Sequence, residues 1–159
     1  MKKIKILIPV YNDWQSLSKL LNNIDSEIQN INHEISIIVA DDASTYDRQL
    51  EIENLLNINI IKILIMKENR GHARCIAAGL KYIFEKEEFD YVIPMDGDGE
   101  DRPEEIKEFI KSIENNPEQT VVGERVKRSE AFIFKFCYFF HKIITLVFTG
   151  HSIKFGNFT

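Results

Sequence analysis

Four short apolar runs alternate with segments in which apolar residues recur every three or four positions. Each run has the length of a strand and is bounded by polar or turn-forming residues. The run ISIIVA is almost entirely apolar, which is typical of a strand buried on both faces of a parallel sheet. We therefore predict strands at residues 3–8, 35–40, 60–66 and 91–95.

The segments between these runs predict amphipathic helices. Asn12 or Asp13 is placed to cap the first helix, and a shorter helical stretch is expected after the sequence DDAST. Residues 71–86 and 103–115 predict two more helices, the second with Pro103 in its first turn. The positions expected to face the core in the three longer helices are Leu17, Leu20, Leu21, Ile24 and Ile28; Ala73, Ile76, Ala77, Leu80, Ile83 and Phe84; and Ile106, Phe109, Ile110 and Ile113.

A short fifth strand is predicted at TVVGE, residues 120–124. This alternation of strands and helices predicts an α/β fold with a mostly parallel central sheet flanked by helices. In such sheets ligands bind at the carboxyl ends of the strands. The polar clusters YND, DDAS and DGDGED follow three of the predicted strands, so the sequence predicts a site at that edge.

Composition supports a compact globular protein. The chain has 159 residues, of which 44% are hydrophobic and 11% aromatic, enough for one packed domain and against a disordered chain. Cys75 and Cys137 form no C-x-x-C pair and predict no disulfide framework, so a reduced cytoplasmic setting is expected. The apolar run in MKKIKILIPVYND is too short for a signal peptide and breaks at Pro9.

Charge is distributed unevenly along the chain. The net charge of −5 divides into −10 for residues 1–124 and +5 for residues 125–159, where six Lys/Arg accompany one acid, Glu130. A basic, aromatic tail on an acidic body indicates that the tail meets something anionic. The acidic body disfavours a long track of phosphates, so no nucleic-acid partner is expected.

The stretch MDGDGEDRPEE places Asp96, Asp98 and Glu100 at alternate positions, separated by glycines. Carboxylates on such a loop suit a hard divalent cation, Mg²⁺ or Mn²⁺, which one or two carboxylates commonly hold together with substrate phosphates. The alternative is a solvated acidic turn that precedes the next helix. On these residues alone both interpretations stay open.

Two further loops carry candidate binding groups. In DDAS, Asp41 and Asp42 are placed either to accept hydrogen bonds from a base or ribose, or to cap a following helix. NRGHAR puts Arg70, His72 and Arg74 near a helix start, a place suited to an anion.

Several common site types are disfavoured by the motifs that the sequence lacks. It contains no Walker loop, no G-x-G-x-x-G after the first strand and no G-x-S-x-G elbow. The histidines lack zinc-ligand spacing, and each is more consistent with a structural or surface role; they are His33, His72, His141 and His151.

The segment AFIFKFCYFFHKIITLVFT, residues 131–149, is rich in phenylalanine and has one narrow polar stripe that contains Lys135 and Lys142. The internal charges disfavour a spanning helix. A basic stripe beside a Phe-rich face suits a helix that lies in the membrane interface, preceded by RVKR for anionic headgroups. The alternative is a helix packed on the sheet or in a homo-oligomer interface.

The motifs IPVYND, IVADDAS, NRGHARCIAAGL, MDGDGEDRPEEI and VVGERVKR, in this order, resemble those of family 2 glycosyltransferases with the GT-A fold. The chain is most similar in pattern to polyprenyl-phosphate sugar transferases of the dolichyl-phosphate mannose synthase type. DGDGEDRPE resembles their D-A-D-L-Q-x-x-P-E stretch at both aspartates, the proline and the final glutamate. The family pattern continues beyond the equivalent of Thr159, which implies truncation at the C-terminus.

The resemblance implies a role for each matching residue. It implies a metal held by Asp96, Asp98 and Glu100, and catalytic roles for Asp98 and Arg125, with Arg125 meeting the donor phosphates or a lipid phosphate. Asn157, in FGNFT, stands where some members carry an acidic residue, and a catalytic role is implied only by that position. The implied nucleotide-sugar site contains Pro9, Tyr11, Asp13 (usually Glu in the family), Ala40, Asp42, Arg70, Gly71, Asp96 and Gly97.

The function implied is an inverting, metal-dependent transfer from a UDP- or GDP-sugar to a polyprenyl phosphate. Transfer to a glycan hydroxyl in surface polysaccharide synthesis, or a catalytically incomplete nucleotide-sugar-binding subunit, are the alternatives. Residues 1–124 would form the nucleotide-sugar-binding core, and residues 125–159 a basic segment for the acceptor or membrane. Such a protein is expected in the cytoplasm, peripheral at the inner face of the cell membrane.

Overall fold

The computed structural model of the chain describes residues 1–52, 55–99 and 101–123. The chain divides into two compact units, Met1–Gln119 and Thr120–Thr159. The first unit contains every described helix and strand.

A parallel sheet of four strands forms the centre of this unit, as predicted. β1 pairs with both β2 and β4, and β2 pairs with β3, so the order across the sheet is β3-β2-β1-β4. All three pairings are parallel, which places the carboxyl ends of the strands along one edge. The strands are β1 (Lys3–Val10), β2 (Glu34–Asp41), β3 (Ile60–Ile65) and β4 (Tyr91–Pro94).

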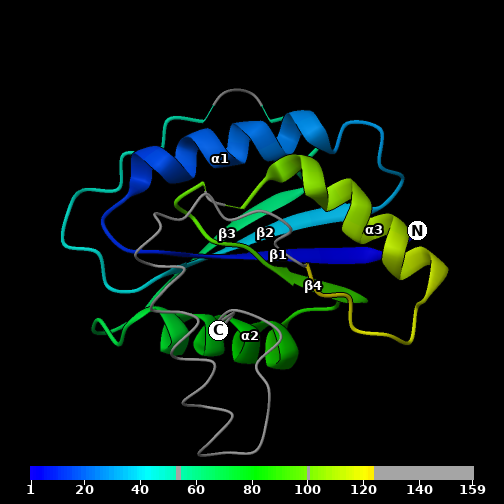
Figure 1. Cartoon of the computed structure of the whole chain (residues 1–159). Coiled ribbons are helices and arrows are strands. Elements are labelled where there is room, and N and C mark those ends of the chain that lie inside the picture. Colours follow the sequence, from blue (N-terminus) through cyan, green and yellow to red (C-terminus); the bar gives the residue numbers. More distant parts are fainter. Residues whose placement is uncertain (53–54, 100, 124–159) are drawn as a thin grey trace, which may run out of the picture. The chain divides into compact units, whose positions relative to one another are not determined.

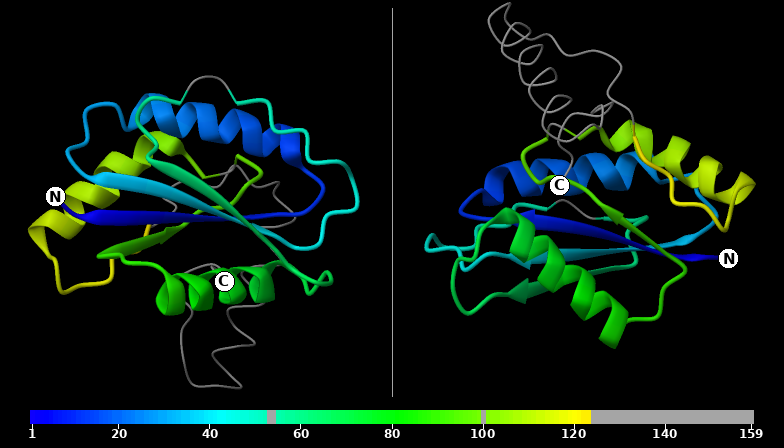
Figure 2. Two further views of the ribbon diagram at one scale, coloured as in Figure 1. Left: turned by 180° about the vertical axis from the view of Figure 1, so that it is seen from behind. Right: turned by 60° about the horizontal axis from the view of Figure 1, so that its bottom comes forward.

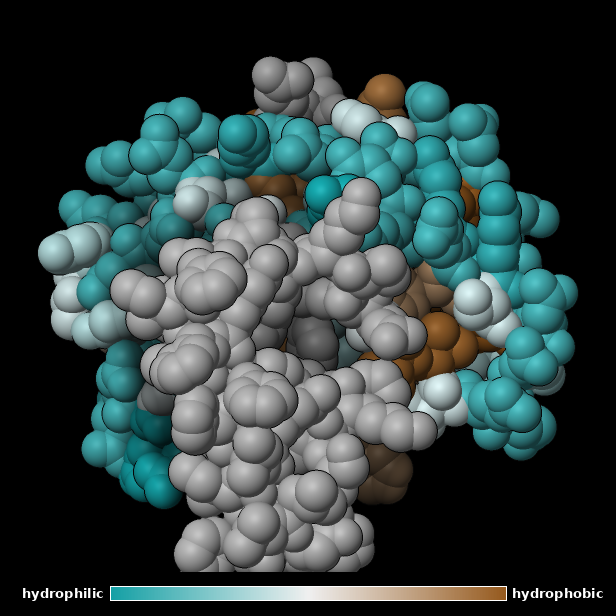
Figure 3. Space-filling model, in the orientation of Figure 1, coloured by the Kyte–Doolittle hydropathy of each residue, from teal (hydrophilic) through white to brown (hydrophobic). Residues whose placement is uncertain are grey.

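Helices cover both faces of the sheet (Figures 1 and 2). α1 (Trp14–Glu27) and α3 (Ile106–Asn115) lie on one face, and α2 (His72–Lys86) lies on the other. A 3₁₀ turn, η1 (Pro103–Glu105), leads into α3. The outward sides of α1 and α3 are mostly hydrophilic, as expected for amphipathic helices (Figure 3).

The α1 and α3 stripes are close to those predicted. All five apolar positions named for α1 are buried, and in α3 only Phe109 is less than fully buried. Consecutive residues of β1 and β2, such as Ile6 and Leu7 or Ile37 and Ile38, are buried, which a strand covered on both faces requires. Asp13, rather than Asn12, caps α1, since its carboxylate accepts the Ser16 N–H at 3.1 Å.

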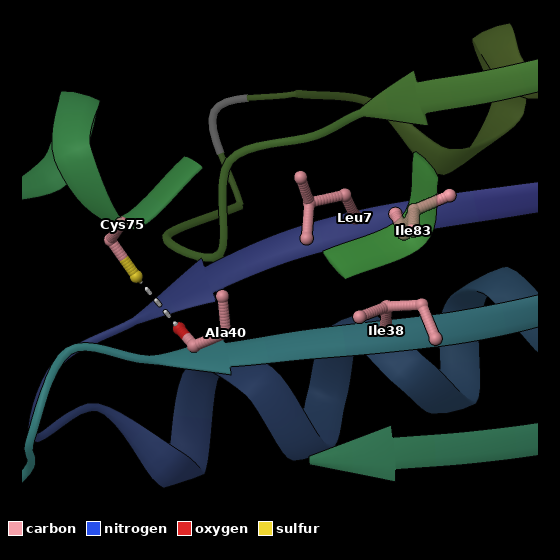
Figure 4. Packing of buried hydrophobic residues seen from close by; sticks show 5 residues of the cluster. All are labelled: Leu7, Ile38, Ala40, Cys75 and Ile83. Carbon is pink, nitrogen blue, oxygen red and sulfur yellow. Dashed lines mark hydrogen bonds between the residues drawn. The ribbon is translucent and has the colours of Figure 1, made fainter. Parts of the chain in front are cut away.

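The inner stripe predicted for α2 is confirmed at Ile83 and in part at Ile76, but it was wrong at Ala73, Ala77, Leu80 and Phe84. The buried residues are Cys75, Gly79 and Ile83, whereas Phe84 is 80% exposed and Leu80 is also exposed. A Cβ at Gly79 would lie only 2.5 Å from Leu7 Cδ1, so the glycine lets α2 approach β1 closely. The helix is therefore rotated to turn Cys75 and Gly79 inward, and Cys75 and Ile83 pack with the β1 and β2 side chains (Figure 4).

The short helix predicted after DDAST was also wrong: residues 42–52 and 55–59 contain none. Side chains of distant elements accept the backbone N–H groups that a helix would have paired internally. Asn12 Oδ1 accepts from Thr45 and Tyr46, and Ser18 Oγ accepts from Glu51. These tertiary hydrogen bonds satisfy the backbone in an irregular conformation.

The fifth strand is likewise not found in residues 120–123, which pair with no strand in the described part of the chain. A run of two valines has strand propensity, but a strand forms only where a neighbour supplies its hydrogen bonds.

Within the same described ranges, no helix combines the length and apolar character needed to cross a bilayer.

Candidate functional site

The loops after β1, β2 and β4 meet at the carboxyl edge of the sheet, as the sequence predicts. The first is anchored at Pro9, which is buried, and presents Tyr11, which is 48% exposed. Asp13 is exposed and caps α1, so one of its oxygens has a structural partner. Tyr11 is thus accessible at this edge, whereas Pro9 is covered by the protein.

Asn12 ties the loop after β1 to the loop after β2. Its N–H donates to Ser44 Oγ at 2.9 Å, and its Oδ1 accepts from the N–H groups of Thr45 at 2.7 Å and Tyr46 at 3.0 Å. The residue has a φ of 57°, which asparagine tolerates better than most residues. Sequence reasoning considered Asn12 only as a helix cap and missed this role.

Asp41 and Asp42 are both buried, and both accept hydrogen bonds from the protein itself. Asp41 accepts from the Ser44 N–H at 2.8 Å and from Arg48 Nε at 3.1 Å. Asp42 accepts from the N–H of Arg70 with one oxygen and from that of Gly71 with the other, each at 2.8 Å. Neither caps a helix in residues 42–52 or 55–59, so that interpretation of DDAS was wrong.

The Arg70–Gly71 segment leads directly into α2. The Arg70 side chain is exposed and forms an ion pair with Glu68. Gly71 has a φ of 84° and a ψ of 159°, a conformation that is essentially restricted to glycine. Its position is therefore set by backbone geometry as well as by the Asp42 hydrogen bond.

The loop after β4 carries Asp96 and Asp98, the two described residues among the three predicted metal ligands. Asp96 is half-buried, and its Oδ1 lies 3.3 Å from Nε2 of His72, the first residue of α2. Its N–H donates to Asp101 Oδ2 at 2.8 Å, whereas Asp98 is exposed. His72, interpreted from sequence as structural or surface, is thus brought to the acidic loop by the start of α2.

Gly97 holds this loop against the end of β1. A Cβ at this position would lie 2.8 Å from the Pro9 carbonyl oxygen, so no larger residue fits without displacing backbone. The close approach joins the Asp96–Asp98 loop to the Pro9–Tyr11 loop. Gly97 is therefore needed for packing, whether or not it contacts a ligand.

Carboxylate oxygens from Asp96 and Asp98 have the donor chemistry that Mg²⁺ and Mn²⁺ prefer. Among the residues that the structure describes, no three His, Cys, Asp or Glu side chains cluster as a metal site. Glu100, the third predicted ligand, lies outside the described residues, as do Arg125, Asn157 and the segment 131–149. A metal held by Asp96 and Asp98 therefore stays a prediction.

Ala40 and Cys75 lie beneath this edge. Cys75 Sγ donates to the Ala40 carbonyl oxygen at 3.2 Å, and both residues are buried (Figure 4). Burial, together with the negative charges of Asp42 and Asp41, raises the pKa of Cys75 to about 11. The thiol is therefore protonated at neutral pH and unsuited to nucleophilic chemistry.

An open hollow of about 500 Å³ lies beside the Asn12 hydrogen bonds, lined by Asn12, Trp14, Thr45, Tyr46, Asp47 and Gln49. None of the residues that the family resemblance implies for the donor lines it. The hollow is thus formed by the loops after β1 and β2 but is not lined by Tyr11, Asp42 or Asp96.

Comparison with known proteins agrees with this geometry. The family model described as glycosyl transferase family 2 matches residues 5–138. The chain belongs to glycosyl transferase family 2. The predicted family and the α/β fold with its parallel sheet are thereby confirmed.

Similar curated proteins transfer sugars to polyprenyl phosphates, according to their names. The undecaprenyl-phosphate 4-deoxy-4-formamido-L-arabinose transferase of Proteus mirabilis is 32% identical over 79% of this chain and 37% of its own length. The UDP-N-acetylglucosamine–dolichyl-phosphate N-acetylglucosaminyltransferase of Methanococcus voltae is also 32% identical, over 82% of this chain and 55% of its own. The family 2 chain thus spans between about a third and a half of these relatives.

A similar fold occurs in a solved structure, that of S. aureus TarS residues 1–349 in complex with UDP. It superposes with a TM-score of 0.53 and 24% identity, over 80% of this chain and 38% of the TarS chain. The similarity shows the shared fold, with the parallel sheet and its flanking helices in common.

Proposed function

We propose that this family 2 protein transfers a sugar, with inversion, from a nucleotide-sugar donor to a polyprenyl phosphate. The observation that carries the proposal is the convergence of Tyr11, Asp42 and Asp96 at one sheet edge in a chain of this family. Relatives that are 32% identical are named as sugar transferases of undecaprenyl phosphate and dolichyl phosphate, which supports the proposed acceptor.

The donor is proposed to lie across the loops after β1, β2 and β4. Tyr11, which is partly exposed, offers a ring face to the base. Asp42 uses both oxygens for backbone N–H groups, but each oxygen keeps a second lone pair for a base or ribose group. A uracil base is favoured because one of the 32% identical relatives is named for a UDP-sugar.

A divalent cation is proposed to be held by Asp96 and Asp98, with Glu100 as a further candidate. When bound, such a cation neutralises negative charge on a leaving diphosphate. The chain's own part is to present two carboxylates on a loop fixed by Gly97 against Pro9. Arg70, exposed at the adjacent loop, offers a guanidinium to the donor phosphates.

A lipid-phosphate acceptor suits this site because it is already anionic at neutral pH. Its oxygen can attack the anomeric carbon as the bond to the diphosphate breaks, without a strong base to remove a proton. Arg125 and the neighbouring basic residues of RVKR are proposed to position it. Attack from the side opposite the leaving group inverts the anomeric configuration.

The proposal is tested by titrating UDP into the protein with and without Mn²⁺, followed by transfer from UDP-sugars to undecaprenyl phosphate in detergent. Asp98→Asn is expected to weaken Mn²⁺-dependent UDP binding by about 10-fold or more, because a metal ligand loses its charge. Glu108→Gln, at an exposed carboxylate of α3, is the control and should leave binding unchanged.

Two results would contradict the proposal. UDP affinity that is the same with and without Mn²⁺ would remove the metal assignment to Asp96 and Asp98. Transfer to a glycan hydroxyl but not to the lipid phosphate would remove the proposed acceptor.

A further inference from the structure

Asp42 joins three elements at the carboxyl edge of the sheet. Its N–H donates to the Val10 carbonyl oxygen at 2.9 Å, which ties it to the end of β1. Its side chain accepts from the N–H groups of Arg70 and Gly71, at the start of α2. The residue is only 4% exposed, so most of its hydrogen-bonding capacity is directed into the protein.

The two side-chain hydrogen bonds fix the first turn of α2. Gly71 adopts a φ of 84°, and its carbonyl oxygen accepts from Arg74 at 3.1 Å and from Cys75 at 3.0 Å. The Asp42 carboxylate holds the N–H side of the same residue. The direction in which α2 leaves the sheet edge is thus set by a charged acceptor in the loop that follows β2.

His72 follows Gly71 directly and stands 3.3 Å from Asp96. A continuous path of contacts therefore runs from the loop after β2, through the start of α2, to the acidic loop after β4. We propose that Asp42 is a positioning residue, which fixes the start of α2 and thereby holds His72 against the Asp96 carboxylate. The inference rests on the proposed function, which supplies the nucleotide and the cation. It extends that function by linking the loop after β2, proposed to bind the base, to the loop after β4, proposed to bind the cation.

An amide at this position could not do the same. An asparagine side chain in place of Asp42 would present one carbonyl oxygen and one NH₂ group, so one of the two backbone N–H groups would face a donor. Charged acceptors also make stronger hydrogen bonds than neutral ones. The Asp42→Asn substitution is therefore nearly isosteric and removes the proposed positioning.

The first experiment needs no ligand. Cys75 is buried one turn into α2, so a thiol reagent reaches it only when the start of the helix opens. In a Cys137→Ser background, Asp42→Asn is expected to increase the labelling rate of Cys75 by about 10-fold or more, beyond any change due to global unfolding. If Asp42→Asn folds poorly, Gly71→Ala takes its place, because it strains the same turn and should also increase the labelling rate of Cys75.

Asp25→Asn is the matched control. Asp25 is also a buried aspartate, and it accepts three backbone N–H groups, but from residues 56–58, far from α2. Its substitution should lower global stability without opening α2 selectively. If Cys75 labelling in Asp42→Asn follows urea-measured global stability just as it does in Asp25→Asn, the positioning role is wrong.

The second experiment measures the Mn²⁺ midpoint, which is the Mn²⁺ concentration that gives half of the maximal Mn²⁺-dependent UDP binding at saturating UDP. Asp42→Asn is expected to raise this Mn²⁺ concentration by about 10-fold, in the range that residues supporting a metal ligand show, although Asp42 is not one of the proposed metal ligands. Tyr11→Ala should weaken UDP binding while leaving this Mn²⁺ midpoint in place. A weakened UDP affinity in Asp42→Asn with an unchanged Mn²⁺ midpoint would overturn the link. If the wild-type protein binds no UDP, the proposed function fails, while the thiol experiment still decides the role of Asp42.

Discussion

Two buried aspartates, Asp25 and Asp42, accept backbone hydrogen bonds from loops at opposite ends of the sheet. Asp25, in the last turn of α1, accepts from Leu56, Asn57 and Ile58, just before β3 begins. Asp42, after β2, holds the start of α2 at the carboxyl end. The chemistry is the same, but only Asp42 is next to residues that are positioned to meet a ligand.

The charged groups at the two ends differ in the same way. At the amino end the Glu87 side chain is 7% exposed and contacts two lysines, Lys62 at 2.6 Å and Lys5 at 3.6 Å. At the carboxyl end, His72 and Asp96 are each about half exposed. The Glu87 carboxylate is thus closed off by the protein, whereas His72 and Asp96 remain accessible to a ligand.

The largest expected effect at the amino end is that of Asp25→Ala. Three backbone N–H groups would lose their acceptor, which we expect to lower the free energy of unfolding by about 3 kcal/mol. UDP affinity should not change, since the residue is remote from the site. Urea denaturation and UDP titration of the same sample measure both, with Ser26→Ala, an exposed α1 hydroxyl, as control. A loss of UDP affinity without a loss of stability would show that Asp25 serves the site and not stability.

The next effect is that of Glu87→Gln, and it depends on pH. The hydrogen bond from Lys62 lowers the pKa of Glu87, against the opposing effect of burial. Because the pKa is lower in the folded state, this stabilisation is present above the ordinary glutamate pKa of about 4.3 and is lost as the pH falls through the folded-state pKa. The variant should therefore be less stable at pH 7, by about 2 kcal/mol, and approach the wild type in acid.

Denaturation at pH values from 7 to 3 measures this difference. Glu88→Gln is the matched control, since Glu88 is 86% exposed and pairs with Lys3 on the surface. Its substitution should change stability little at any pH. A constant difference between Glu87→Gln and wild type across the pH range would show that packing, and not the ion pairs, is responsible.

The smallest expected effect on stability comes with a functional loss, in Gly97→Ala. The added Cβ would meet the Pro9 carbonyl oxygen at 2.8 Å, so the acidic loop must move away from β1, at a cost of about 1–2 kcal/mol. We expect Mn²⁺-dependent UDP binding to fall more than stability suggests. Gly99→Ala provides the comparison, because its added Cβ meets nothing within 4 Å and tests only its φ of 83°. Equal effects of the two variants on binding would contradict the packing argument.

Much of the fold could be predicted from sequence because local periodicity reports which face of an element is buried. The four strands of the sheet and the α1 stripe follow from the positions of apolar and polar residues, whereas the sequence left the α1 cap open between Asn12 and Asp13. The α2 face was mispredicted because close packing against Leu7 selected Gly79 over larger apolar residues. The pair of small residues Cys75 and Gly79, one turn apart and followed by Ile83, was the available signal.

The sequence by itself therefore determined the α/β class, the edge at which polar loops converge and the family of the chain. Only the tertiary structure decided what those loops do to one another. The Asp42 carboxylate binds N–H groups 28 and 29 residues further along the chain, and Asn12 binds the loop 33 residues away. No local pattern encodes such pairs, because they form only when the packed sheet brings its carboxyl ends together.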